Sequence, residues 1–405
     1  MAGSPRSPSG PGSGSGPGPG PGAAGAGAVR WFLVRVAAAV AATAIVLFVG
    51  GFLIGHQASG PAAAWAKSSG QDALWLGHGW LAGPGAGAGG TGGGSGSGGS
   101  GSGGSGSGGS GSGGSGSGGS GSGGSDSYAG DGGRGLAALT ARIRGSGVND
   151  VYVLAGQLSA GGQLDPSQYA GAAAFLRSFH AALPHVRVCA WLNGTVGQGQ
   201  LNLDDAAVRA AVVASAAALL HAGFGGISYD LTPVASGDSG LLDLLDATRA
   251  LHPGILSVDA PKVEPLAGMG LPAALIMRRP VFWTSGYLGD VASRVSQVAL
   301  MSYDTGVPVP SWYSGYVARE TAIALRAVPA GVGLVIGLPA FAGSTLGHHG
   351  SAETVPAAIH GVRVALTGSH HPRSTLGVGL YTADSATARD WSAYQSGWVA
   401  PDGSG

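Results

Sequence analysis

The feature that most constrains this chain is a regular alternation of short apolar segments with longer amphipathic segments, from about residue 135 to residue 396. The short segments are rich in Val, Ile and Leu, which is typical of buried strands, and the longer ones repeat apolar residues at helical spacing. Because strands that alternate with helices form right-handed crossover units, the pattern predicts a parallel sheet. We expect strands at 150–156, 186–194, 225–233, 255–261, 297–304, 332–341 and 377–383.

This set is one strand short of the eight that close a parallel barrel. The segment "DALWLGHGWL", Asp72 to Leu81, is apolar and rich in strand-forming residues, and it supplies the missing first strand. A Gly/Ser tract with the repeat "GSGGS" follows at about 83–127 and has the composition of a flexible coil. Lengthening a loop from about 10 to about 50 residues costs only about 1.4 kcal/mol. We therefore expect one (βα)8 TIM barrel, an α/β fold, over residues 71–398, interrupted by this low-complexity insertion.

The N-terminal region predicts a membrane anchor. Residues 1–30 are almost entirely Gly, Pro, Ser and Ala and are expected to form a disordered tail. Residues 36–55 carry no charge, and as a helix 20 residues rise about 30 Å, the hydrocarbon thickness of a bilayer. We expect one transmembrane helix within 31–55 and a linker at 56–70.

Positive charges set the expected orientation of this helix. Arg30 and Arg35 precede the apolar segment, and no Lys or Arg follows until Lys67. The positive-inside rule then predicts a cytoplasmic N-terminus and an extracytoplasmic barrel in a single-pass protein of the cell membrane. A cleaved signal peptide is the alternative, because "AAAWA" at 62–66 has the small residues of a cleavage site. Both interpretations place the barrel outside the cytoplasm.

Composition makes nucleic acid an unexpected partner and gives no sign of a cofactor. The formal net charge is zero, and no basic run follows the N-terminal region. Cys189 is the single cysteine, so neither an internal disulfide nor a thiolate metal cluster is available, and we expect a buried strand residue there. His348 and His349 are expected in one surface loop and His370 and His371 in another, on opposite faces, so no metal site is predicted.

Polar residues at the strand ends carry the expected chemistry. In a parallel barrel the C-terminal ends of the strands and the loops after them form the active face. Side chains alternate along a strand, so Ser228, Asp230 and Thr232 share one side, and the apolar residues between them face the helices. Asp230 is therefore expected at the barrel mouth. Asn193, Asp259 and Asp304 follow other strands and are expected at the same face.

Four short motifs resemble glycoside hydrolase family 18, the chitinase-like barrels. They are "GGISYDLTP" at 225–233, "MSYD" at 301–304, "GLPAF" at 337–341 and "GVGLY" at 377–381. The family signature on the fourth strand is D-G-x-D-x-D-x-E, and only Gly226 and Asp230 match it. Thr232 stands where the resemblance implies the Glu that protonates the glycosidic oxygen. In the family the Asp at the position of Asp230 orients the acetamido group of the substrate, which acts as the nucleophile.

The resemblance and the strand positions together give the candidate site. Tyr303 and Asp304 fall on family positions that contact the acetamido group, and aromatic side chains near the strand ends could stack on sugar rings. The candidate catalytic residues are Asp230, Asp304 and Asp259, and the candidate substrate-binding residues are Tyr303, Met301, Trp191, Asn193 and Tyr381. Trp283, Trp312 and Tyr313 are further aromatics, for which core packing is the simpler role.

Three functions remain open from the sequence. The first is a membrane-anchored, extracytoplasmic glycoside hydrolase-like protein that binds or processes an N-acetylhexosamine-containing glycan, with weak or no hydrolysis because Thr232 cannot donate a proton near neutral pH. The second is an active glycosidase that uses Asp230 with Asp259 or Asp304. The third is a non-catalytic structural ectodomain.

Overall fold

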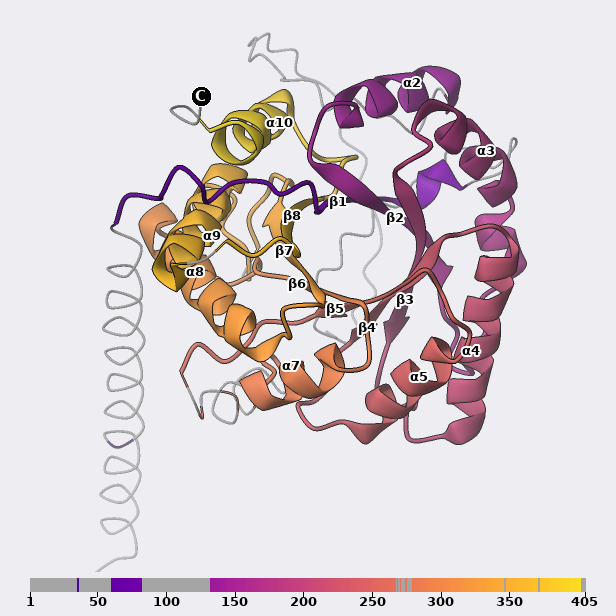
Figure 1. Cartoon of the computed structure of the whole chain (residues 1–405). Helices are drawn as coiled ribbons and strands as arrows, with labels where there is room; N and C mark the ends of the chain where they lie inside the picture. The colour runs from indigo at the N-terminus through magenta and orange to yellow at the C-terminus, as the bar shows by residue number, and fades with distance from the viewer. Residues whose placement is uncertain are drawn as a thin grey trace, which may run out of the picture. The chain divides into compact units, whose positions relative to one another are not determined.

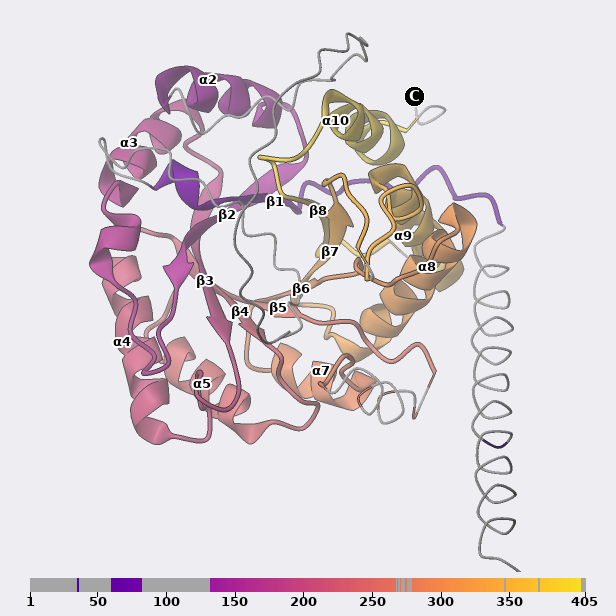
Figure 2. The ribbon, with the colours of Figure 1, turned by 180° about the vertical axis from the view of Figure 1, so that it is seen from behind.

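The computed structural model describes residues 35, 60–81, 132–266, 268, 270, 274, 279–345, 347–370 and 372–401. The chain divides into two units, Met1–Phe52 and Leu53–Gly405, and within the first only Arg35 is described. The strands of the second unit form a closed parallel barrel in the order β1 to β8, and helices surround it (Figures 1 and 2). The predicted (βα)8 architecture is confirmed for this unit.

The strands and helices alternate along the chain. The strands are β1 (Asp72–Leu76), β2 (Val148–Gln157), β3 (Arg187–Thr195), β4 (Gly226–Thr232), β5 (Ile255–Ala260), β6 (Gln297–Leu300), β7 (Gly333–Pro339) and β8 (Leu376–Tyr381). The α-helices are α2 (Gly132–Ile143), α3 (Ala172–Ala182), α4 (Ala206–His221), α5 (Ser239–Arg249), α7 (Ser285–Ala292), α8 (Pro310–Ala327), α9 (Val355–Ser369) and α10 (Ala388–Tyr394). Short 3-10 turns lie at His78–Trp80 and Pro166–Tyr169, and a π-turn at Gln395–Val399.

The first strand lies upstream of the Gly/Ser tract, as predicted. β1 pairs with β2 on one side and with β8 on the other, which closes the barrel. It is shorter than expected, because the strand ends at Leu76 and residues 78–80 form a 3-10 turn instead of continuing the strand. The tract itself, 83–127, lies outside the described residues, as do the tail 1–30 and the apolar segment 36–55. No helix within the described ranges is both long and apolar enough to cross a membrane.

Two other boundaries differ from the prediction. The sixth strand ends at Leu300, so residues 301–304 form an irregular segment at the barrel mouth. Helix α8 begins at Pro310, whereas the helical pattern of the sequence "YVARETAIALRAV" predicts a start at Tyr316. Proline suits the first turn of a helix because its missing N–H would have no partner there.

Side chains that alternate along the strands build two apolar layers. Ile227, Tyr229 and Leu231 join the outer layer between strands and helices, where the Tyr229 hydroxyl lies 2.9 Å from Thr248 Oγ1 on α5. A smaller cluster fills the barrel interior, and Trp75 is its largest member. Gly379 on β8 makes room for the Trp75 ring, because a Cβ at this position would overlap the ring. The predicted orientation of the fourth strand is therefore confirmed. Cys189 lies fully buried in the interior cluster, as expected.

A buried carboxylate at the start of β1 connects this strand to the C-terminal part of the barrel by hydrogen bonds. Asp72 is fully buried and accepts hydrogen bonds from Val378 N at 2.9 Å, from Tyr394 Oη at 2.8 Å and from Trp398 Nε1 at 2.8 Å. Ser68 Oγ donates a further hydrogen bond to it at 2.6 Å. One side chain thus links β1 to β8 and to the C-terminal helical segment. Burial raises the pKa of Asp72, and these donors counteract only part of that rise.

Candidate functional site

Three neighbouring strands bring Asn193, Asp230 and Asp259 together at the C-terminal end of the barrel. Asn193 on β3 is in register with Asp230 on β4, and its Nδ2 donates a hydrogen bond to Asp230 Oδ2 at 3.2 Å. Tyr229 on β4 is in register with Val258 on β5. The next residues along these two strands, Asp230 and Asp259, therefore lie side by side. Strands in a sheet lie about 4.8 Å apart, which makes the two carboxyl groups close neighbours.

The two aspartates have different surroundings, and burial raises the pKa of both. Asp230 is partly accessible to solvent, whereas Asp259 is 2% exposed and accepts a hydrogen bond from Ser228 Oγ at 3.3 Å. Burial raises the pKa of Asp230 to about 6, and the facing Trp191 indole opposes that rise. Burial, and then the neighbouring Asp230 charge, raise the pKa of Asp259 well above the ordinary range. Of the two carboxyl groups, Asp259 is therefore the one whose charged form is disfavoured more strongly.

Aromatic rings surround this carboxyl pair. Tyr381 at the end of β8 packs against Tyr303 with ring centroids 5.0 Å apart and against Trp191 with centroids 5.7 Å apart. Phe341, just after β7, lies 5.7 Å from Tyr303 by the same measure. Tyr303 Oη also contacts Met301 Sδ at 3.0 Å. The candidate binding residues Trp191, Asn193, Met301, Tyr303 and Tyr381 thus gather at one end of the barrel, and Phe341 is an addition that sequence reasoning did not single out.

Asp304 lies on the same face but has a different partner. Its φ of 55° is in the left-handed region, and its Oδ1 lies 3.2 Å from His348 Nδ1. His348 Nδ1 also lies 3.3 Å from Glu353 Oε2. The expectation that His348 belongs to a surface loop is wrong, because its side chain is only 3% exposed and the Phe341 ring lies over it at 4.4 Å between centroids. Asp304 therefore forms an ion pair with a buried histidine.

Burial lowers the pKa of His348, but the carboxylates of Asp304 and Glu353 outweigh burial and raise it to about 9. Glu353 also accepts hydrogen bonds from the backbone N–H groups of Thr305 and Gly306, both at 3.1 Å. The chain contains only three glutamates, and Glu353 follows His348 by five residues. A rare Glu close to a His was the available sequence signal for this cluster, and the prediction missed it.

A second buried acid lies behind the mouth, on α8. Glu320 is fully buried, and its Oε1 accepts hydrogen bonds from Val263 N at 2.8 Å and from Tyr316 Oη at 2.9 Å. Burial raises the pKa of Glu320 to about 7. The amine of Lys262 interacts with it electrostatically, and burial lowers the pKa of that amine. This acid belongs to the outer layer and not to the carboxyl pair.

Two other aromatic candidates pack in the core, as expected. Trp283 is 1% exposed and donates from Nε1 to Val234 O at 3.0 Å, and Tyr313 is fully buried and donates to Ser302 O at 3.0 Å. Trp312 is partly buried.

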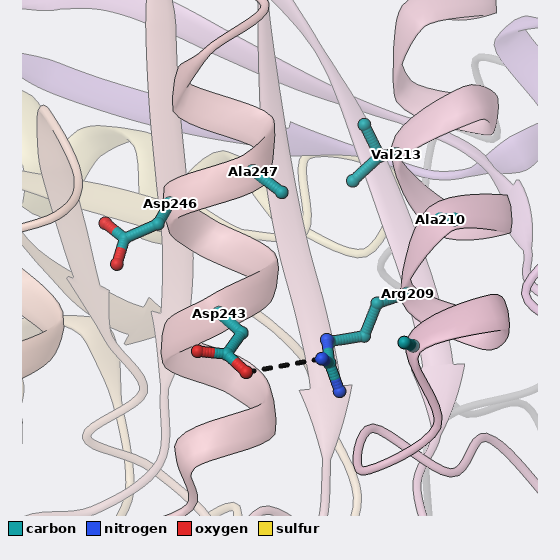
Figure 3. Close-up of a pocket in the computed structure, with 7 residues that line it drawn as sticks. Arg209, Ala210, Val213, Asp243, Asp246 and Ala247 are labelled. Atoms are coloured by element: carbon teal, nitrogen blue, oxygen red, sulfur yellow. Dashed lines mark ion pairs between the residues drawn. The ribbon is translucent and has the colours of Figure 1, made fainter.

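A well-formed surface hollow lies away from the barrel mouth, between α4 and α5. Arg209, Ala210 and Val213 line it on α4, and Asp243, Asp246 and Ala247 line it on α5 (Figure 3). Arg209 Nη2 pairs with Asp243 Oδ2 at 3.3 Å across the hollow. Alanine and valine supply four of its seven lining residues, and its charged residues are Arg209, Asp243 and Asp246. Its chemistry gives no reason to prefer it to the strand ends as the functional site.

Comparisons with known proteins find similar solved structures but no similar sequences. No family model matches the chain, and no curated protein matches it. Among solved structures, a class V chitinase from Pseudomonas fluorescens Pf-5 is 14% identical with a TM-score of 0.45, over 65% of this chain and 94% of that chain. The spore cortex-lytic enzyme SleL from Bacillus cereus is 12% identical with a TM-score of 0.47, over 65% and 70%. A family GH18 chitinase from Chromobacterium violaceum is 18% identical with a TM-score of 0.41, over 62% and 75%. These likenesses concern the barrel alone, which the closed strand order establishes independently.

Proposed function

We propose that this protein binds a glycan that contains N-acetylhexosamine at the C-terminal end of its barrel, and that it hydrolyses this glycan slowly or not at all. The observation that carries the proposal is a charged, partly accessible Asp230 that is held by Asn193 and stands below the aromatic rings of Trp191, Tyr303 and Tyr381. A carboxylate accepts hydrogen bonds from sugar O–H and acetamido N–H groups, and aromatic rings pack on the apolar faces of sugars. The family 18 resemblance of "GGISYDLTP" and "MSYD" implies contacts to the acetamido group for Asp230 and Tyr303.

Slow hydrolysis follows from the lack of a placed proton donor. Thr232, two residues after Asp230, has an exposed side chain but carries no acid. Asp259 has a raised pKa but is almost completely enclosed, and Asp304 is paired with His348. Loss of a general acid costs about 10²–10⁴ in rate. The barrel would then hold a sugar chain without cleaving it efficiently.

The attachment to a membrane is part of the same proposal and rests on sequence alone. The uncharged segment 36–55 and the arginines before it support a single-pass anchor with the barrel outside the cytoplasm. Such an anchor would keep the glycan-binding face at the cell surface, where polysaccharides are encountered.

The test is a binding measurement on the full-length chain in detergent. A glycan array followed by calorimetry with N-acetylglucosamine oligomers is expected to show binding that Asp230→Ala weakens at least about tenfold, since it removes a charge-assisted hydrogen bond. Binding should strengthen as the pH rises through about 6, where Asp230 loses its proton. Asp243→Ala, at the hollow between α4 and α5, serves as the control and should bind normally. No binding to any glycan, or equal binding by Asp230→Ala, would refute the proposal and favour a structural ectodomain.

A second candidate function is hydrolysis with Asp259 as the proton donor. It is favoured by the raised pKa of Asp259, which is the property of a general acid. It requires that Asp259, at 2% exposure, reach the glycosidic oxygen after a rearrangement of Asp230. Measurable chitin-oligomer cleavage by wild type that Asp259→Asn abolishes would establish this function, and absence of cleavage would exclude it.

A further inference from the structure

We propose that Asp304, His348 and Glu353 bind a divalent transition-metal ion of the zinc type beside the barrel mouth. Asp304 follows β6, whereas His348 and Glu353 lie in the segment between β7 and α9, so the cluster joins two loops. Each residue offers one ligand atom, and the three atoms all lie within 4.8 Å of one another. The cluster is separate from the pair of Asp230 and Asp259, and the inference does not depend on the glycan proposal.

The distances between the ligand atoms suit one shared ion. Zinc lies about 2.0–2.2 Å from nitrogen and oxygen ligands, so two ligands of one ion are about 3.0–3.5 Å apart at octahedral or tetrahedral angles. His348 Nδ1 lies 3.2 Å from Asp304 Oδ1 and 3.3 Å from Glu353 Oε2. Both separations fall within that interval. The Asp304 and Glu353 oxygens lie within 4.8 Å of each other, and a shared ion would draw them to about 3.0–3.5 Å.

The histidine supplies an independent observation. His348 is 97% enclosed by protein, and neither of its ring nitrogens makes a well-directed hydrogen bond to any described residue. Nδ1 lies at short range from both carboxylates, but neither contact has the direction of a hydrogen bond, so both are ion pairs only. A buried donor or acceptor without a partner costs about 1–3 kcal/mol. A metal ion bound to Nδ1 would satisfy this nitrogen and both carboxylates together.

Neighbouring groups hold the ligands in place, as in established metal sites. The backbone N–H groups of Thr305, Gly306 and His349 donate to Glu353 at 3.1, 3.1 and 3.3 Å, and the Phe341 ring packs on the imidazole. Such outer contacts orient a ligand and tune its affinity for the ion. The cluster therefore has an organised carboxylate and a fixed imidazole, with Asp304 as the more mobile third ligand.

The ligand set selects the class of metal. Imidazole nitrogen favours zinc and related transition ions over calcium and magnesium, which prefer oxygen ligands throughout. The ion would displace the proton from Nδ1, after which a neutral imidazole and two carboxylates balance the charge of a dication. The side chain of Asp304 is 42% exposed, so one side of the cluster remains open to solvent. Three protein ligands with an open position are typical of zinc sites that also bind water or a substrate group.

The experiment is a zinc titration of the full-length chain, purified with a tag other than polyhistidine and stripped with a chelator. Calorimetry is expected to show one zinc ion per chain, and Co²⁺ substitution a visible spectrum of low-symmetry coordination. His348→Gln and Asp304→Asn should each weaken binding at least about tenfold, because each removes one of three ligands. His349→Gln changes a neighbouring histidine outside the ligand set and should bind as wild type. Circular dichroism confirms that each variant is folded.

Two results would overturn the proposal. One is a chain that takes up no zinc or cobalt at micromolar concentrations, which would leave the cluster as an ion pair that joins two loops. The other is wild-type affinity in both His348→Gln and Asp304→Asn, which would place any bound metal elsewhere. The measurement uses no glycan, so its outcome is independent of whether sugar binding is found.

Discussion

At the scale of single residues, Asp230 and Asp259 have the same side chain in different surroundings. Asp230 reaches solvent and has an Asn193 amide to share its charge, whereas Asp259 is enclosed and lies next to that charge. Two adjacent carboxyl groups rarely ionise together in a buried place, and the pKa of the more enclosed one, Asp259, is raised by both burial and the neighbouring charge.

Replacement of Thr232 by glutamate tests whether only the acid is missing. Thr232→Glu is expected to give measurable cleavage of N-acetylglucosamine oligomers, because it restores a proton donor two residues from Asp230, and a general acid is worth about 10²–10⁴ in rate. Release of reducing sugar provides the measurement. Thr195→Glu is the matched control, since Thr195 is in register with Thr232 on the neighbouring strand and is also exposed. If neither variant, or both equally, released sugar, the assignment of Thr232 to the acid position would be wrong.

At the scale of the elements, periodicity was a reliable guide where one face of a segment is buried. The alternation in 225–233 predicted that Tyr229 faces the helices and Asp230 the barrel mouth, and both placements are found. The predicted ends of helices and strands were wrong where a single residue had a stronger local preference than the apolar pattern. Pro310 starts α8 early, and the chain leaves β6 at Leu300 before the sharp turn at Asp304. The order of the strands could be predicted from the eight strand segments alone. The residues that contact each strand end could be known only from the closed barrel.

The contact between β1 and the C-terminal segment gives an element-scale prediction. Asp72→Ala is expected to lower the free energy of unfolding by about 3–5 kcal/mol, because it leaves the buried donors Val378 N, Tyr394 Oη and Trp398 Nε1 without an acceptor. Urea unfolding followed by tryptophan fluorescence measures the change. Asp72→Asn retains one acceptor oxygen and should lose clearly less. Equal stability of wild type and Asp72→Ala would contradict the role of this residue in closing the barrel.

At the scale of the whole molecule, closure brings together residues that are far apart in the chain. Asp72 meets Trp398, and Asp304 meets Glu353, across segments that no local pattern connects. The closed barrel also encloses acids such as Glu320, so their protons become linked to folding. The free energy of unfolding therefore depends on pH through groups that only the folded barrel buries.

Glu320 gives a prediction for this pH dependence. Its pKa is about 7 in the folded chain and 4.5 as an ordinary glutamate, so the folded state holds this proton to higher pH than the unfolded state. Its contribution to stability is present below pH 4.5, falls as the pH rises from 4.5 to about 7 and is constant above that. Glu320→Gln is always neutral, and its Oε1 still accepts from Val263 and Tyr316. It should be more stable than wild type by up to about 3 kcal/mol above pH 7.

Chemical denaturation at pH 4.5, 6 and 8 measures the difference between Glu320→Gln and wild type. The two should agree most closely at pH 4.5 and diverge as the pH rises. The comparison isolates Glu320, because Asp230 and His348 titrate in both proteins. A constant difference across this range would show that Glu320 does not hold its proton in the folded state.

The sequence by itself determined the barrel, the position of its first strand and the side of β4 on which Asp230 lies. These properties depend on the local alternation of apolar and polar residues, which the chain carries whatever its distant contacts are. Only the tertiary structure decided that the pKa of Asp259 is raised beside Asp230, that His348 is enclosed, and that Glu353 lies beside it together with Asp304. Each of these depends on burial and on the charges of neighbouring strands and loops, and both arise only when the barrel closes.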